Sequence, residues 1–145
     1  MRRDYFTIDV DTTGPKPVVT VEFDGPDGLL DERLTDESGA PLDAEDVDIS
    51  YRLREPVADD AKGVLALSDR YTGEFRFELN ATAGTVLGLV RAARAADEEG
   101  DDDSFRLVVE HDRPLLDIEA DTLLVYDENG GLLRRHSLLS SGVEL

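Results

Sequence analysis

Most residues with metal-binding or catalytic chemistry in this chain are carboxylates. The densest group is DEEGDDDS, residues 97–104, which places six acidic side chains in eight positions. Such clusters supply the oxygen ligands that Ca²⁺ prefers, but a helix–loop–helix calcium site needs glycine at its sixth position and glutamate at its twelfth. Counted from Asp97, these positions hold Asp102 and Val108. We therefore interpret the run as a solvated loop between a helix and a strand, without a metal.

Histidine is the other residue type that could do chemistry here, and it occurs only as His111 and His136. Together with Asp112, the two imidazoles would form a ligand set that suits zinc or iron, if neighbouring strands brought them together. Scattered histidines are more typical of strand faces, so we nominate no metal ligand and no cofactor. His136 precedes Ser137, and neighbours on a strand point to opposite faces, which argues against a serine nucleophile with this base.

Other catalytic constellations cannot be assigned from the sequence. Cysteine is absent, which excludes thiolate nucleophiles, thiolate metal sites and disulfides. With 34 Asp and Glu residues, no carboxylate pair can be singled out as a catalytic dyad. A carboxylate-dependent enzyme thus remains an alternative without named residues, and we favour a non-enzymatic protein.

The charge balance is the strongest compositional signal. The chain has 34 acidic residues against 15 Lys and Arg, a formal net charge of −19, and only two of the bases are lysines. A surface of this kind repels itself in dilute buffer, whereas at about 1 M salt the Debye length shrinks to roughly 3 Å and the repulsion is screened. The composition predicts a halophilic protein. It also argues against nucleic-acid binding, which needs a basic footprint.

The sequence also bears on localisation. No stretch approaches the roughly 20 apolar residues that span a bilayer. The opening MRRDYFTIDV alternates polar and apolar residues and has no apolar run behind its arginines, unlike an export signal. We expect a cytoplasmic protein that is not associated with a membrane.

The elements that must position any site are mostly strands. Apolar and polar residues alternate with a period of two, the pattern of a sheet with one face in water. The alternating runs lie at residues 6–10, 19–23, 47–53, 75–79, 105–109, 123–126 and 132–139. The DENGG turn at residues 127–131 predicts a C-terminal hairpin. About seven or eight antiparallel strands in a single domain, residues 1–145, indicate a β-sandwich or a small barrel.

One segment changes to helical periodicity. Over residues 83–96, an apolar stripe recurs at helical spacing, and the hydroxyl of Thr82 could cap the first turn. Gly84 and Gly88 each lower intrinsic helicity by up to about 1 kcal/mol relative to alanine. We therefore expect one inserted α-helix near residues 83–96, held by packing its stripe against a sheet.

Two resemblances add to this interpretation. The opening MRRDYF, the segment RAARAADEEG and the closing LLVYDENGGLLRRHSLLSSGVEL resemble a small haloarchaeal protein family of unknown function. That likeness implies a cytoplasmic, single-domain halophilic protein and no known activity. The stretches LTDESGAPLDAEDVDISYRL and GVLALSDRYTGEFRFEL are similar to strand–turn–strand units of immunoglobulin-like modules. This second likeness favours a mainly β, antiparallel immunoglobulin-like β-sandwich over a barrel.

Two long segments lack acidic residues in this acidic chain, residues 79–96 and 129–143. A halophilic protein covers its water-facing surface with carboxylates, so such segments are either buried or reserved for contact. We predict a protein-interaction module in which the helix and the C-terminal hairpin face a partner or a second copy. The candidate residues are Gly84, Gly88, Arg91, Arg94, Arg135 and His136. A small-ligand-binding sandwich with a pocket between helix and sheet is the alternative.

Overall fold

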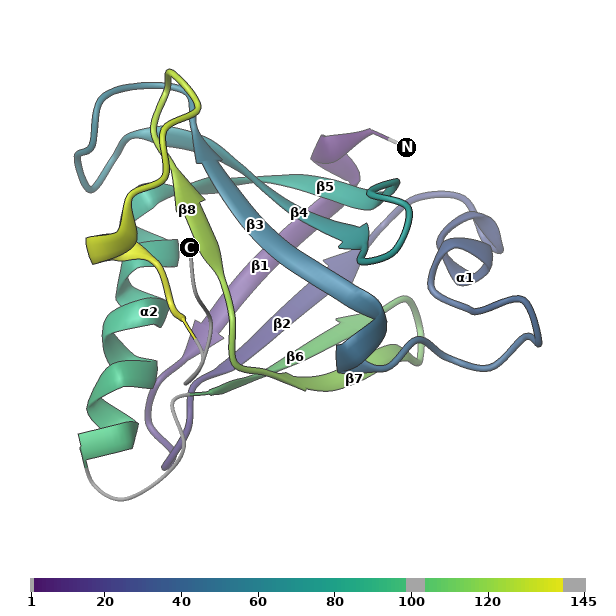
Figure 1. Ribbon diagram of the computed structural model, residues 1–145. Helices are drawn as coiled ribbons and strands as arrows, with labels where there is room; N and C mark the ends of the chain where they lie inside the picture. Colours follow the sequence, from purple (N-terminus) through teal and green to yellow (C-terminus); the bar gives the residue numbers. More distant parts are fainter. Residues whose placement is uncertain (1, 99–103, 140–145) are drawn as a thin grey trace.

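The computed structural model describes residues 2–98 and 104–139 and confirms the mainly β fold (Figure 1). Within these residues, eight strands form two four-stranded sheets that pack as a sandwich. The order in the first sheet is β1 (Phe6–Asp11), β2 (Val18–Phe23), β6 (Phe105–Glu110) and β7 (Pro114–Ala120). The order in the second sheet is β5 (Phe75–Thr82), β4 (Lys62–Asp69), β3 (Val47–Leu53) and β8 (Leu124–Tyr126).

The strand directions differ from the expected purely antiparallel arrangement. Four of the six described strand pairs are antiparallel, but β2 pairs with β6 and β3 pairs with β8 in parallel. Each parallel pair joins strands that are distant in the sequence, and periodicity within a strand carries no signal of its direction. The immunoglobulin-like resemblance therefore stays a prediction, whereas the sandwich of two mixed sheets is observed.

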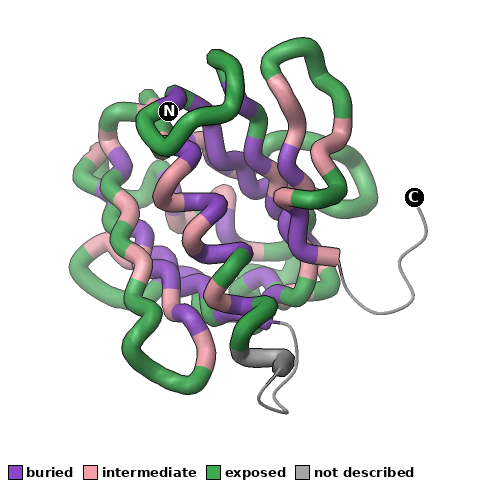
Figure 2. Tube along the Cα trace, turned by 90° about the vertical axis from the view of Figure 1, so that its left-hand side faces the viewer, coloured by how far each residue is buried: buried purple, intermediate pink, exposed green. Residues whose placement is uncertain are grey.

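The predicted helix is present as α2 (Ala83–Glu98), and it lies along one side of the sandwich (Figures 1 and 2). Its apolar stripe is buried, with Val86, Leu89 and Val90 at most 2% exposed. The backbone N–H groups of Ala83 and Gly84 donate to carbonyl oxygens of the loop before β4. That loop thus accepts two N–H groups of the first turn. The predicted cap by the Thr82 hydroxyl is wrong, because this hydroxyl bonds to Thr85 Oγ1 instead of to a helix N–H.

Short helices complete the described chain. They are α1 (Leu29–Arg33) and the 3₁₀ turns η1 (Arg3–Tyr5), η2 (Ala44–Asp46) and η3 (Arg134–His136). None of the helices in the described ranges is long and apolar enough to cross a membrane.

The sandwich core is tightly filled around Tyr51. This side chain is fully buried, its hydroxyl donates to the Ala81 carbonyl oxygen at 2.8 Å, and burial raises the pKa of the phenol to about 12. Gly63 on β4 leaves room for the ring, because a Cβ at that position would lie 2.3 Å from both Cζ and the hydroxyl oxygen of Tyr51. Glycine is thus required here by close packing and not by a turn.

The C-terminal segment departs from the predicted hairpin. It returns antiparallel to β8 through isolated bridges between Tyr126 and Leu132 and between Leu123 and Leu138, but η3 replaces the expected strand between them. The buried Ser137 explains the difference: its hydroxyl donates to the Leu133 carbonyl oxygen and accepts the N–H of Val125. The Ser137 hydroxyl therefore accepts the Val125 N–H, where a regular strand pair would offer a backbone carbonyl oxygen. The placement of Arg135, His136 and Ser137 on a strand was wrong.

Most of the acidic run that opened the sequence lies outside the described residues, which resume at Ser104. Ser104 itself is 3% exposed, and its hydroxyl donates to Glu119 Oε1 at 2.8 Å. It lies immediately before β6 and is buried, so this end of the run is not a solvated loop.

Candidate functional site

The acid-poor helix and the C-terminal segment come together in the structure, although they are distant in the sequence. Arg94 on α2 makes the connection: one guanidinium nitrogen donates to the Arg135 carbonyl oxygen at 2.8 Å, and another donates to that of Ser137. Helix carbonyls and turn carbonyls are strong acceptors for a cation. Arg94 is therefore a structural link between α2 and η3, as well as part of the surface.

The two glycines of the helix have different surroundings. At Gly84, a Cβ would lie 2.9 Å from the carbonyl oxygen of Asp59, so this glycine is needed for an internal contact with the loop before β4. At Gly88, the nearest atom to a Cβ would be a guanidinium nitrogen of Arg91, 3.9 Å away. Gly88 thus stays a candidate for a close approach from outside, whereas Gly84 is explained by the fold.

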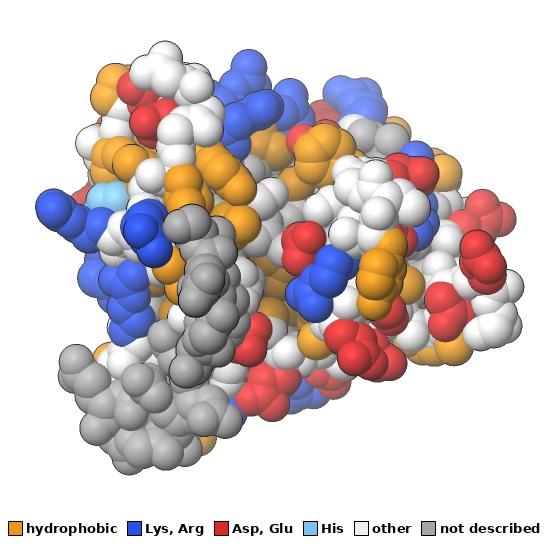
Figure 3. Space-filling view, viewed as in Figure 1, with side chains coloured by type: hydrophobic (Ala, Val, Ile, Leu, Met, Phe, Trp, Pro, Cys, Tyr) orange, Lys and Arg blue, Asp and Glu red, His pale blue; other side chains and the backbone are white. Residues whose placement is uncertain are grey.

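Arginine side chains gather over α2 and η3, as the left side of Figure 3 shows. Arg91, Arg94, Arg134 and Arg135 are all exposed, and His136 is half-buried beside them. Among the side chains that the structure describes, residues 2–95 and 104–139, none of these four arginines forms an ion pair with a carboxylate. We call the surface formed by Gly88, Arg91, Arg94, Arg134, Arg135 and His136 the arginine face.

The alternative expected from the sequence, a ligand pocket between helix and sheet, has little room where Leu89 of α2 meets the strands. Between the sheets, the space lined by side chains such as Val21, Leu65, Phe77 and Leu107 holds about 10 Å³. That volume is about what one water molecule requires, and the lining is wholly apolar. Drug-sized ligands occupy pockets of roughly 300 Å³ or more. The inter-sheet space is therefore packed core.

A second polar site, which the sequence did not indicate, lies at the carboxyl ends of β2 and β6. Parallel pairing aligns Glu22 with Glu110 and so brings the residues that follow both strands to one edge. There Asp27, His111 and Asp112 each offer one ligand atom, all within 4.8 Å of one another. The structure thus combines His111 with Asp27 and not with His136, which the sequence had suggested. Only the three-dimensional pairing of β2 with β6 reveals this partner.

The His111 ring is held firmly. Nδ1 lies 2.8 Å from the Phe23 carbonyl oxygen, Nε2 lies 2.6 Å from Asp27 Oδ1, and the ring packs edge-on against the Phe23 ring. The Asp27 carboxylate and the Phe23 carbonyl both accept hydrogen bonds from the ring and raise the pKa of His111. The His111 side chain is 14% exposed and that of Asp27 is 91% exposed. A fixed and mostly covered imidazole thus meets a freely accessible carboxylate.

The surroundings of this site are strongly negative. His111 and Asp112 line an open hollow of about 530 Å³, together with Glu22, Asp24 and Glu110. The one arginine in the lining, Arg113, pairs with Asp31 at 3.0 Å. Asp112 is also the one non-glycine residue with positive φ (63°) in the described chain. Such a conformation is uncommon and Asp tolerates it better than most residues.

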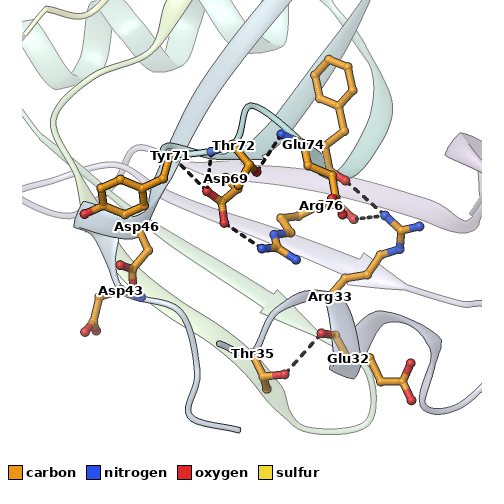
Figure 4. A network of polar contacts seen from close by, with 11 residues as sticks. Glu32, Arg33, Thr35, Asp43, Asp46, Asp69, Tyr71, Thr72, Glu74 and Arg76 are labelled. Carbon is orange, nitrogen blue, oxygen red and sulfur yellow. Dashed lines mark hydrogen bonds and ion pairs between the residues drawn. The ribbon is translucent and has the colours of Figure 1, made fainter. Parts of the chain in front are cut away.

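A third polar network stabilises the turn between β4 and β5 (Figure 4). Asp69 accepts hydrogen bonds from the N–H groups of Tyr71 and Thr72 and from the Arg76 guanidinium at 2.7 Å. The Arg76 guanidinium, followed by these backbone donors, lowers the Asp69 pKa to about 2. Both carboxylate oxygens of Asp69 have donors within this turn, whereas Arg76 Nε is buried without a partner. The hydrogen bonds to Asp69 hold the turn together, so we interpret the network as structural.

Comparison with known proteins places the chain in a family. A family model described as "Family of unknown function (DUF5793)" matches residues 1–145. The chain belongs to this family. No curated protein and no solved structure matches it. This agrees with the resemblance to a family of unknown function and supplies no activity to transfer.

Proposed function

We propose that the chain is a non-enzymatic protein-interaction module that binds a partner, or a second copy of itself, through the arginine face. The observation that carries the proposal is the convergence of four exposed arginines from two segments far apart in sequence. None of them has a carboxylate partner among the side chains of residues 2–95 and 104–139. In a chain with a net charge of −19, such a surface differs sharply from the rest.

The chemistry of arginine explains what the face would bind. The planar guanidinium pairs with a carboxylate through two parallel hydrogen bonds, and arginine is enriched in protein interfaces. Gly88 has no side chain, and the nearest atom to a Cβ there would be the end of the flexible Arg91 side chain, so a partner backbone could approach the helix closely. An acidic protein surface therefore fits this face, and another acidic protein or the acidic surface of a second copy can supply it.

We further propose that the protein works in the cytoplasm at molar salt and is of haloarchaeal type. The support is the excess of acidic residues together with the near absence of lysine. Exposed charges lose most of their mutual repulsion at about 1 M salt. Under those conditions, weak surface pairs are screened too, so a stable complex needs several well-aligned arginine–carboxylate contacts. The arginine face offers such a set.

The test compares binding by the wild-type chain with binding by two variants, all in molar KCl. The double variant Arg91→Asp, Arg135→Asp reverses charge on the face and retains Arg94, which the fold needs. Gly88→Leu adds bulk without changing charge. Arg2→Asp, at the N-terminal end that lies away from α2 (Figure 1), is the matched charge control.

Light scattering after size exclusion reports self-association, and affinity capture reports other partners. We expect wild type and Arg2→Asp to form the same complex and both face variants to lose it while keeping the wild-type circular-dichroism spectrum. Face variants that are folded and bind like wild type would refute the proposal.

A further inference from the structure

We infer that Asp27, His111 and Asp112 form a binding site for a first-row divalent metal ion such as Zn²⁺. The site lies at the carboxyl ends of β2 and β6, away from the arginine face (Figure 1), and is independent of the function proposed above. It departs from the sequence-based expectation, which considered His111, His136 and Asp112 as ligands and nominated none because scattered histidines are more typical of strand faces.

The first argument is the orientation of the imidazole. A metal-binding histidine usually donates its other ring N–H to a carbonyl or carboxylate, which fixes the tautomer and turns the free nitrogen toward the metal. His111 has this arrangement: Nδ1 is 2.8 Å from the Phe23 carbonyl oxygen, and that oxygen can only accept. Nε2 therefore points toward Asp27, where a metal ion would replace its proton.

The second argument is the spacing of the donor atoms. Zinc binds imidazole nitrogen and carboxylate oxygen at about 2.0–2.2 Å, so its ligand atoms lie roughly 3–3.5 Å apart. Nε2 and Asp27 Oδ1 are now 2.6 Å apart, and Asp112 offers an oxygen within 4.8 Å of both. Asp27 is almost fully exposed and free to move outward by the small distance required. Three protein ligands leave a coordination position for water.

The third argument is the electrostatic field at the hollow. Glu22 and Glu110 are register neighbours on the parallel strands, and like charges in such positions repel. Asp24 and Asp112 add two further carboxylates, while Arg113 is engaged with Asp31. A divalent cation at this edge would compensate charges that no described side chain compensates. The imidazole ligand selects zinc-like ions over Ca²⁺ and Mg²⁺, which prefer oxygen ligands alone.

The experiment is a titration of the full chain with ZnCl₂ against a chromophoric chelator in molar KCl, which suppresses diffuse binding to the acidic surface. We expect one equivalent of tightly bound Zn²⁺ per chain and no displacement by equal CaCl₂. Asp27→Asn and Asp112→Asn should each weaken binding at least about tenfold, since each removes one charged ligand. Asparagine tolerates the positive φ at residue 112, and Asp27 is exposed, so both variants should fold.

His136→Gln is the matched control, because it removes the other histidine from a site elsewhere on the molecule. It should bind Zn²⁺ like wild type. Retention of wild-type affinity by both Asp variants would overturn the inference. So would equally tight Ca²⁺ binding, which would make the hollow an ordinary carboxylate surface.

Discussion

Replacing Ser137 with alanine tests the account of the C-terminal segment, because this hydroxyl joins η3 to β8. The Ser137 side chain is fully buried, accepts the N–H of Val125 at 2.9 Å and donates to the Leu133 carbonyl oxygen at 2.8 Å. In Ser137→Ala, the Leu133 oxygen keeps the N–H of His136, but the Val125 N–H loses this partner. A buried N–H group left without an acceptor costs about 1–3 kcal/mol, and the lost bond to the Leu133 carbonyl oxygen adds about 0.5–1 kcal/mol.

We therefore expect the free energy of unfolding to fall by roughly 2–3 kcal/mol, and Tm by roughly 5–10 °C for a chain of this size. The assay is thermal and urea unfolding followed by circular dichroism in molar KCl. Ser38→Ala is the control, since its exposed hydroxyl bonds only to the neighbouring Asp36 carboxylate. That change should cost less than about 0.5 kcal/mol. If the two variants lose the same stability, the Ser137 hydroxyl does not hold η3, and the reasoning fails.

Three further predictions concern the core, the β4–β5 turn and the surface charge. Gly63→Ala should lower the free energy of unfolding by at least about 1–3 kcal/mol in urea titrations, because its Cβ would overlap the buried Tyr51 ring; an unchanged midpoint would contradict the close packing. Asp69→Asn should destabilise the fold at neutral pH. Because folding lowers this pKa from 3.8 to about 2, the stabilising contribution is present above pH 3.8 and disappears as the pH falls through about 2. The difference in Tm between wild type and variant should therefore shrink over that interval, and a constant difference would refute the assignment. Finally, the circular-dichroism signal should weaken as KCl is diluted from molar to millimolar, since 34 carboxylates then repel one another; a full native signal with unchanged Tm would exclude halophilic adaptation.

Local patterns predicted the elements whose periodicity is regular. The alternation around Val19 and Val21, and the helical stripe at Val86, Leu89 and Val90, identified β2 and α2 correctly because one face of each is buried. Two strands, β4 and β7, had not been named as runs, although β7 alternates buried and exposed residues from Leu116 to Ala120. In β4, five consecutive residues from Gly63 to Leu67 are buried, so the period-two signal disappears.

The site was harder to predict than the elements, because its contacts depend on pairing between distant segments. Arg94 was correctly identified as a surface residue. Its hydrogen bonds to the carbonyl oxygens of Arg135 and Ser137 depend on the turn η3, where the sequence had predicted a strand. Asp27 was one of many acidic residues in the sequence. Only the parallel pairing of β2 with β6 brings it to His111. Charge and periodicity carry no information about such pairing.

The two parallel strand pairs also have a consequence for how the protein folds. The segments β3, β4, β5 and α2 lie between β2 and its partner β6, and β3 is similarly far in sequence from β8. Contacts of such high sequence separation slow folding, since a long loop must close before they form. Until then, the edges of β2 and β3 can pair with other nascent chains. Pairing of β6 with β2 and of β8 with β3 therefore closes these two edges and removes them as sites of aggregation.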